Sequence, residues 1–182
     1  MDFLEIKEKV IKEISSTLDK VGKVDELVAE IVSASKVFVV GSGRSKLIIE
    51  AFAQRLRHLG LNVYVVGAVI QQPASKGDLL IVASGSGESV FPLSIARKAK
   101  ALEMNIALIT AEKSSPVACI ADLTVYIPAP TKFTRSKAEV FQPLGSLFEQ
   151  CLLIFCDAVV IIIQKTKKIS TQILQKNHAN LE

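Results

Sequence analysis

The stretch VFVVGSGRS, residues 37–45, decides the fold, because a short apolar run stops at a loop of glycine and serine and a helical pattern follows. Residues 79–89, LLIVASGSGES, repeat that order. A buried strand that turns tightly into a helix directs the unpaired N–H groups of the helix outward, at the carboxyl end of the strand. Such a position attracts anions, phosphate above all. The two loops therefore predict a site for a phosphorylated ligand, with a plain strand-to-helix turn as the alternative for each.

The rest of the chain continues the alternation of strands and helices. Apolar spacings of three and four residues predict helices at 3–18, 22–34, 45–59, 90–102, 144–164 and 169–178, with a short helix at 116–120. Short apolar runs predict strands at 37–40, 62–66, 79–83, 106–109 and 123–127. Strands joined through helices imply right-handed crossovers. We therefore expect an α/β fold with one domain over residues 1–182, in which helices flank a five-stranded parallel sheet as a three-layer sandwich.

The composition of the 182-residue chain disfavours several classes of protein. Hydrophobic residues make up 49% and aromatic residues 5%, which favours aliphatic parallel strands covered by helices. The net charge of +4 comes from scattered lysines, so nucleic-acid binding is disfavoured and an anionic small molecule is favoured. The three cysteines have no metal-ligand spacing, so we expect no metal and reduced cysteines in the core.

The apolar stretch 151–163 predicts a buried helix. Its 13 residues fall short of the ~20 that a membrane span needs, and Asp157 interrupts them. The N-terminal sequence MDFLEIKEKV carries acidic residues and lacks the apolar core of a signal peptide. We therefore expect a cytoplasmic protein that contacts no membrane.

The same stretch bears on the oligomeric state. A helix that is apolar on nearly every face must be covered on every face. The cover is either a second copy of the chain or the helix at 3–18 of the same chain. We expect a homo-oligomer, a tetramer in preference to a dimer, with the helix at 3–18 as a second candidate interface.

The glycine loop at 41–45 does not match the nucleotide-binding patterns. Lys46 stands where the GxGxxG pattern of dinucleotide-binding folds needs its third glycine. The strand at 62–66 ends without an acidic residue for a ribose hydroxyl, and the sequence has no Walker A motif. We therefore expect no nicotinamide or nucleotide cofactor. Arg44 is explained equally well as an anion ligand and as a solvated side chain.

Three titratable side chains are candidates for chemistry. Glu149 lies on the amphipathic half of the helix at 144–164, where spacing alone favours a surface glutamate. His178, near the C-terminus, and His58, after a helix with two arginines, both have the positions of solvated residues. The long polar connection at 128–142 is a candidate active-site loop.

The chain resembles the sugar isomerase (SIS) domain family. The residues that carry the resemblance are the loop Gly41-Ser42-Gly43-Arg44-Ser45 and the loop Ser84-Gly85-Ser86-Gly87-Glu88-Ser89, which is similar to the SxSGxT/S phosphate-binding motif of the family. The segments QPLGSLFEQ (142–150) and HANLE (178–182) narrow the resemblance to the 6-phospho-3-hexuloisomerases, over essentially the whole chain. The resemblance implies a single SIS-type domain, an isomerase activity and no metal or redox cofactor.

The resemblance also implies roles for individual residues. Glu149 takes the position of the general base proposed for the family, and His178 assists, in its own site or in that of a neighbouring subunit. The residues implied to bind the substrate phosphate are Ser42, Gly43, Arg44, Ser84, Gly85, Ser86, Gly87 and Ser89. The implied reaction converts D-arabino-3-hexulose 6-phosphate into fructose 6-phosphate in the ribulose monophosphate pathway of formaldehyde fixation. Another phosphosugar isomerase and a non-catalytic phosphosugar-binding protein are the alternatives.

Overall fold

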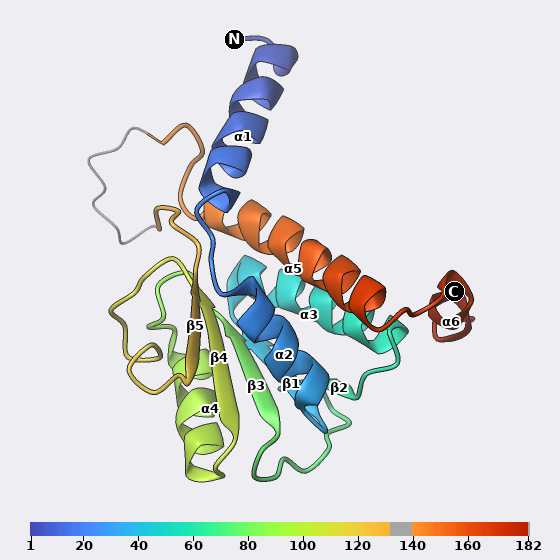
Figure 1. Ribbon diagram of the computed structural model, residues 1–182. Helices are drawn as coiled ribbons and strands as arrows, with labels where there is room; N and C mark the ends of the chain where they lie inside the picture. Colours follow the sequence, from blue (N-terminus) through green and yellow to red (C-terminus); the bar gives the residue numbers. More distant parts are fainter. Residues whose placement is uncertain (132–139, 182) are drawn as a thin grey trace.

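A computed structural model of the chain, which describes residues 1–131 and 140–181, shows an open parallel sheet covered by helices (Figure 1). The helices are α1 (Phe3–Leu18), α2 (Val24–Ser33), α3 (Gly43–His58), α4 (Val90–Ala101), α5 (Ser146–Thr166) and α6 (Thr171–Lys176). The strands are β1 (Val37–Gly41), β2 (Val63–Val65), β3 (Leu79–Ala83), β4 (Asn105–Thr110) and β5 (Leu123–Tyr126). These strands form a sheet in the order β2-β1-β3-β4-β5, and each neighbouring pair is parallel. The predicted five-stranded parallel sheet is confirmed.

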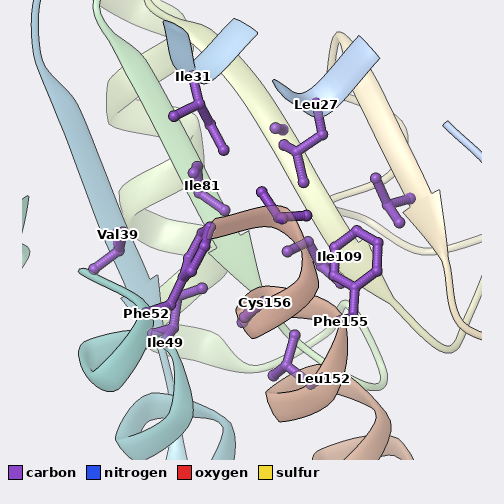
Figure 2. Packing of buried hydrophobic residues seen from close by; sticks show 14 of the residues in the cluster. Leu27, Ile31, Val39, Ile49, Phe52, Ile81, Ile109, Leu152, Phe155 and Cys156 are labelled. Atoms are coloured by element: carbon purple, nitrogen blue, oxygen red, sulfur yellow. The ribbon is translucent and has the colours of Figure 1, made fainter. Parts of the chain in front are cut away.

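Successive strand residues face opposite sides of the sheet and build two apolar cores. Val39, Ile81 and Ile109 pack with residues of α2, α3 and α5, as Figure 2 shows. Leu80 and Leu108 face the other side and pack against α4. A parallel sheet that is buried on both faces needs apolar residues at every position, which explains the uninterrupted apolar runs in the sequence. Helices α2, α3 and α5 cover one face of the sheet and α4 covers the other, which gives the predicted three-layer sandwich.

Helix α5 packs beside α3 and has one buried and one exposed side. Among the described helices it is the one that is long and apolar enough, by length and composition alone, to cross a membrane. Nine of its 21 residues are buried in the core, which is the pattern of a core helix in a folded domain. Its opposite side leaves Leu153, Ile154 and Ile161 exposed. The predicted burial therefore holds for one side of α5, and the other side is uncovered in the single chain.

Helix α1 projects away from the body of the domain (Figure 1). Its C-terminal turns contact α5, where Ile14 and Leu18 pack against the core. Its N-terminal turns carry exposed apolar side chains, namely Phe3, Leu4, Ile6 and Ile11. The helix therefore covers only a part of α5.

Two predictions of local structure are wrong. Residues 116–120 form turns and no helix, because the hydrogen bonds from Cys119 N–H to Ser115 O and from Ala121 N–H to Val117 O are not consecutive. The long helix begins at Ser146 and not at 144, because Leu144 has a φ of 54°, outside the helical region. Of the candidate active-site loop, residues 132–139 lie outside the described part of the chain.

His58 is buried, contrary to the expectation of a solvated side chain. Its exposed fraction is 6%, because it ends α3 and lies under α6 and the C-terminal segment. Its ring stacks on the ring of His178, with 4.9 Å between the centroids. The Asn177 side-chain amide donates to the His58 carbonyl at 3.0 Å and fastens the segment there.

The three cysteines should differ sharply in reactivity. Burial, and next to it the charge of Glu13, raises the pKa of Cys151 to about 11. Burial, with the charge of Asp157, raises the pKa of Cys156 further. Because a raised pKa keeps a thiol protonated and the thiolate is the nucleophile, neither should react at pH 8. Cys119 is exposed and should react at once.

Titration of the native protein with a thiol-reactive disulfide reagent at pH 8 should therefore give one fast thiol. The same titration in guanidinium should give all three. Fast reaction of a second thiol in the native protein would contradict the burial of α5.

Candidate functional site

The two glycine–serine loops start side by side. Strands β1 and β3 are hydrogen-bonded neighbours, and their register pairs Gly41 with Ala83, the last residue of each strand. From β1 the chain passes to β2 on one side and then crosses back to β3 on the other. This reversal opens a crevice at the carboxyl ends of the strands, where open α/β folds bind ligands.

Gly41 allows α3 to begin directly behind β1. A Cβ atom at Gly41 would lie 3.0 Å from both the backbone N and the Cα of Lys46. Ser42 is the N-cap residue of α3, and Ser89 is that of α4; neither side chain makes a capping hydrogen bond. Both helices therefore present backbone N–H groups at this edge, beside hydroxyls that are not used for capping.

The loop after β3 is held by its own hydrogen bonds and by β4. Ser84 Oγ accepts a hydrogen bond from the backbone N–H of Gly87 at 3.0 Å. The Thr110 hydroxyl donates to the Gly85 carbonyl at 3.2 Å. Because Ser84 is only 3% exposed, its side chain shapes the loop from inside.

A pocket of about 270 Å³ lies between these two loops and the start of α5. It brings together seven of the residues that the sequence singled out, namely Ser42, Gly43, Arg44, Gly85, Ser86, Ser89 and Glu149. Ser84 and Gly87, which were also predicted as phosphate ligands, do not line it. The sequence reasoning missed Ser45, Thr131, Leu144, Gly145 and Phe148 as lining residues. Three of these five lie in QPLGSLFEQ, so a closer reading of that segment could have found them.

Glu149 and Arg44 meet across this pocket. Arg44 lies in the first turn of α3, and Glu149 lies in the first turn of α5. Arg44 Nε donates to Glu149 Oε2, and the two charged groups form an ion pair. The Arg44 side chain is 67% exposed, whereas that of Glu149 is 16% exposed. The carboxylate that spacing alone assigned to the surface is therefore mostly buried and lies in the pocket wall.

His178 lies elsewhere in this chain. It lines a different and larger hollow of about 660 Å³, together with Arg55 and His58 of α3 and Asp157 of α5. From Glu149 to the α5 residues that line this hollow, Asp157 to Gln164, the helix rises by about 12–22 Å. His178 and Glu149 of one chain therefore do not line the same pocket, as the position of the C-terminus in Figure 1 also indicates.

The pocket combines donors suited to an anion with one carboxylate. Two helix N-termini and the residues Ser42, Ser86 and Ser89 line it. Glu149 lines the same pocket, and its carboxylate can accept a proton from a bound molecule. Within residues 1–131 and 140–181, no group of three or more His, Cys, Asp or Glu side chains is arranged to hold a metal ion.

Comparison with known proteins finds a matching family and relatives that are similar over most of the chain. A model of the SIS domain matches residues 30–140. A 3-hexulose-6-phosphate isomerase of Bacillus subtilis is 39% identical over 159 residues, which cover 87% of this chain and 86% of that protein. A 3-hexulose-6-phosphate isomerase of Mycobacterium gastri is 40% identical over 93% of this chain and 86% of its own length.

A solved structure supports the same comparison. A crystal structure from Methanococcus jannaschii, for which a 3-hexulose-6-phosphate isomerase function was inferred, is 36% identical in sequence. It superposes with a TM-score of 0.86 and covers 98% of this chain and 99% of its own. The likeness therefore extends over the sheet, both loops and helix α5.

The packing of Gly87 provides a test of the loop geometry. Gly87 has a φ of 64°, and an added Cβ would overlap the Ser115 hydroxyl and lie 2.5 Å from Ser115 Cβ. Gly77 is a matched control, because its φ is 79° and an added Cβ meets no described atom within 4 Å. Both Gly→Ala variants carry the cost of a positive φ, and Gly87→Ala should lose about 1–3 kcal/mol more through overpacking.

Urea unfolding of the two variants measures this difference. Equal midpoints for Gly77→Ala and Gly87→Ala would show that the loop does not pack tightly against Ser115.

Proposed function

The chain belongs to the SIS domain family, and from that premise we propose that it is a 3-hexulose-6-phosphate isomerase. The observation that carries the proposal is the pocket, which is lined both by the serine-rich loops and by Glu149. Several relatives named as this isomerase match most of the chain at 37–40% identity.

The chemistry requires one base and oriented oxygen atoms. The substrate carries a carbonyl at C3 and a hydrogen and hydroxyl at C2, and the product carries the carbonyl at C2. Glu149 takes the proton from C2, which gives a cis-enediol(ate), and then returns it to C3. The O2 proton passes to O3, so that atoms and charge balance. One carboxylate above both carbons can serve both transfers, because C2 and C3 are adjacent.

The phosphate binds at the opposite end of the pocket. The hydroxyls of Ser42, Ser86 and Ser89 and the N–H groups of Gly43 and Gly85 receive it, at two helix N-termini. Ser84 and Gly87 act by holding the loop in shape. Binding the phosphate away from the reacting carbons orients the sugar over Glu149 and so lowers the entropic part of the barrier.

The proposed reaction has a metabolic setting. An isomerase for D-arabino-3-hexulose 6-phosphate works after the condensation of formaldehyde with ribulose 5-phosphate, in the ribulose monophosphate pathway. The product is fructose 6-phosphate. We place the enzyme in the cytoplasm, where its phosphorylated substrate is made.

The substitution Glu149→Gln tests the chemistry. The amide cannot take the C2 proton, so kcat should fall by about 10²- to 10⁴-fold, while the affinity for the sugar phosphate is retained. The assay supplies formaldehyde, ribulose 5-phosphate and a hexulose-phosphate synthase, and follows fructose 6-phosphate. Glu26→Gln, on the exposed side of α2, is the control and should keep full activity.

Each of the other outcomes has a definite meaning. Unchanged turnover in Glu149→Gln would remove this residue from the mechanism. A wild-type protein that binds phosphosugars but turns none over would be a non-catalytic binding protein. Turnover of a different phosphosugar alone would identify another isomerase.

The enzyme should assemble from several copies of the chain. The uncovered side of α5 and the projecting N-terminal half of α1 both expose apolar side chains. Apolar helix faces of this kind are what subunit interfaces bury. His178, which lies far from Glu149 of its own chain, then acts as an assistant in the pocket of a neighbouring subunit.

Intersubunit complementation tests this arrangement. Glu149→Gln and His178→Ala should each be nearly inactive alone. When the two are co-expressed and assemble at random, about a quarter of the sites should contain both native residues, and activity should return to that level. Light scattering on the same samples gives the oligomeric state. A monomer, or a mixture that stays inactive, would contradict the shared site.

A further inference from the structure

The pairing of Arg44 with Glu149 suggests a role for Arg44 that differs from phosphate binding. The pair joins the first turns of α3 and α5, which are 105 residues apart in the chain. Residues of both turns line the pocket. The contact is made through Nε of the guanidinium and Oε2 of the carboxylate.

The two partners differ in their access to water. With 16% exposure, the Glu149 side chain has lost most of its hydration and needs a partner for its charge. With 67% exposure, Arg44 is well solvated and does not need Glu149 for its own stability. In the part of the chain that the structure describes, the ion-pair partner of Glu149 is Arg44. The ion pair therefore mainly stabilises the charge of the Glu149 carboxylate.

We infer that Arg44 is a positioning residue, which holds the Glu149 carboxylate in one orientation over the pocket. The inference rests on the proposed isomerase function and names a further determinant of that site. A hydrogen bond to Oε2 fixes the plane of the carboxylate and leaves Oε1 for the substrate proton. A base that must reach two adjacent carbons in turn needs such a fixed plane.

A phosphate-clamp role for Arg44 accounts less well for these contacts. Hydroxyls and helix N-termini already line the loop side of the pocket. Turning Arg44 toward a phosphate would leave the mostly buried Glu149 charge without this partner, which is costly. The two roles also predict different kinetics, because a positioning residue acts on kcat and a phosphate ligand acts on KM.

The test uses the variants Arg44→Met and Arg44→Lys of the full chain. Arg44→Met removes the charge and the donor at similar length. It should lower kcat by about a hundredfold, the cost of a base misplaced by about 1 Å. KM for the sugar phosphate and the inhibition constant of inorganic phosphate should stay within about threefold of wild type. Arg44→Lys should recover part of kcat, because it restores the charge but not the planar donor geometry.

A double-mutant cycle shows whether Arg44 acts through Glu149. If it does, Arg44→Met should cause no further loss of kcat in the Glu149→Gln background. The reverse pattern, a rise in KM and in the phosphate inhibition constant with kcat unchanged, would overturn the inference in favour of a phosphate clamp. Equal losses of kcat in both backgrounds would overturn it as well.

A failure of the proposed role of Arg44 can be distinguished from a failure of the proposed isomerase function. Wild-type protein without isomerase activity would refute the proposed function. The Arg44–Glu149 contact can still be tested by urea unfolding of the wild type, the two single variants and the double variant. The effects of Arg44→Met and Glu149→Gln on the unfolding equilibrium constant should differ from additivity by about tenfold. Additive unfolding effects would show that no such coupling exists, whatever the activity.

Discussion

The structure depends on one pairing, that of β1 with β3 in a register that sets Gly41 opposite Ala83. Each of these residues ends its strand, so the two loops that follow leave the sheet at the same height. A change of register by one residue would point one loop away from the other and turn a core face of the strand toward the wrong helices. A shift would also exchange the side chains that pack against α3 and α5 with those that pack against α4, and the close packing of both cores opposes that exchange. The site is thus a consequence of core packing.

Helix α5 carries the second constraint. Its inner side fills the core between α3 and the sheet, and Phe148 packs near the loop, with Phe148 Cδ1 3.2 Å from an added Cβ at Gly85. The residue next to Phe148 is Glu149, so the packing that seats the phenyl ring also fixes where the carboxylate emerges. The glycine–serine loops and Glu149 are therefore positioned by one continuous core, which holds them at fixed places relative to each other.

The sequence predicted most of the fold because its signals are local. Apolar runs of four to six residues and helical spacings depend only on which faces are buried, and they placed each strand within two residues of its bounds. The failures have physical causes of the same local kind. Leu144 takes a positive φ that spacing does not reveal, and the turn at 116–120 has too few bonds to continue as a helix.

The site was predictable only in part, because its contacts are long-range. The glycine–serine loops were predicted to line the pocket, since strand ends and helix N-termini are visible in the sequence, and they do line it. Nothing in the spacing indicates that Arg44 reaches Glu149 across 105 residues, or that His58 is buried under His178. The resemblance to a family supplied Glu149, and only the three-dimensional structure supplied its partner. Ser84 is the opposite case, because its hydroxyl matches the motif and accepts a hydrogen bond from the Gly87 N–H within the loop.

The charges of the pocket follow from the same geometry. A phosphorylated sugar brings negative charge toward a cavity whose wall already holds a carboxylate, and like charges at close range oppose binding. Two devices reduce that cost. In the proposed complex the phosphate binds at helix N-termini, which carry partial positive charge. The carboxylate is paired with Arg44, which lies in the first turn of one of those helices. Because Ser42, Gly43 and Arg44 are consecutive, this single turn links the binding of the anion to the orientation of Glu149 in the proposed mechanism.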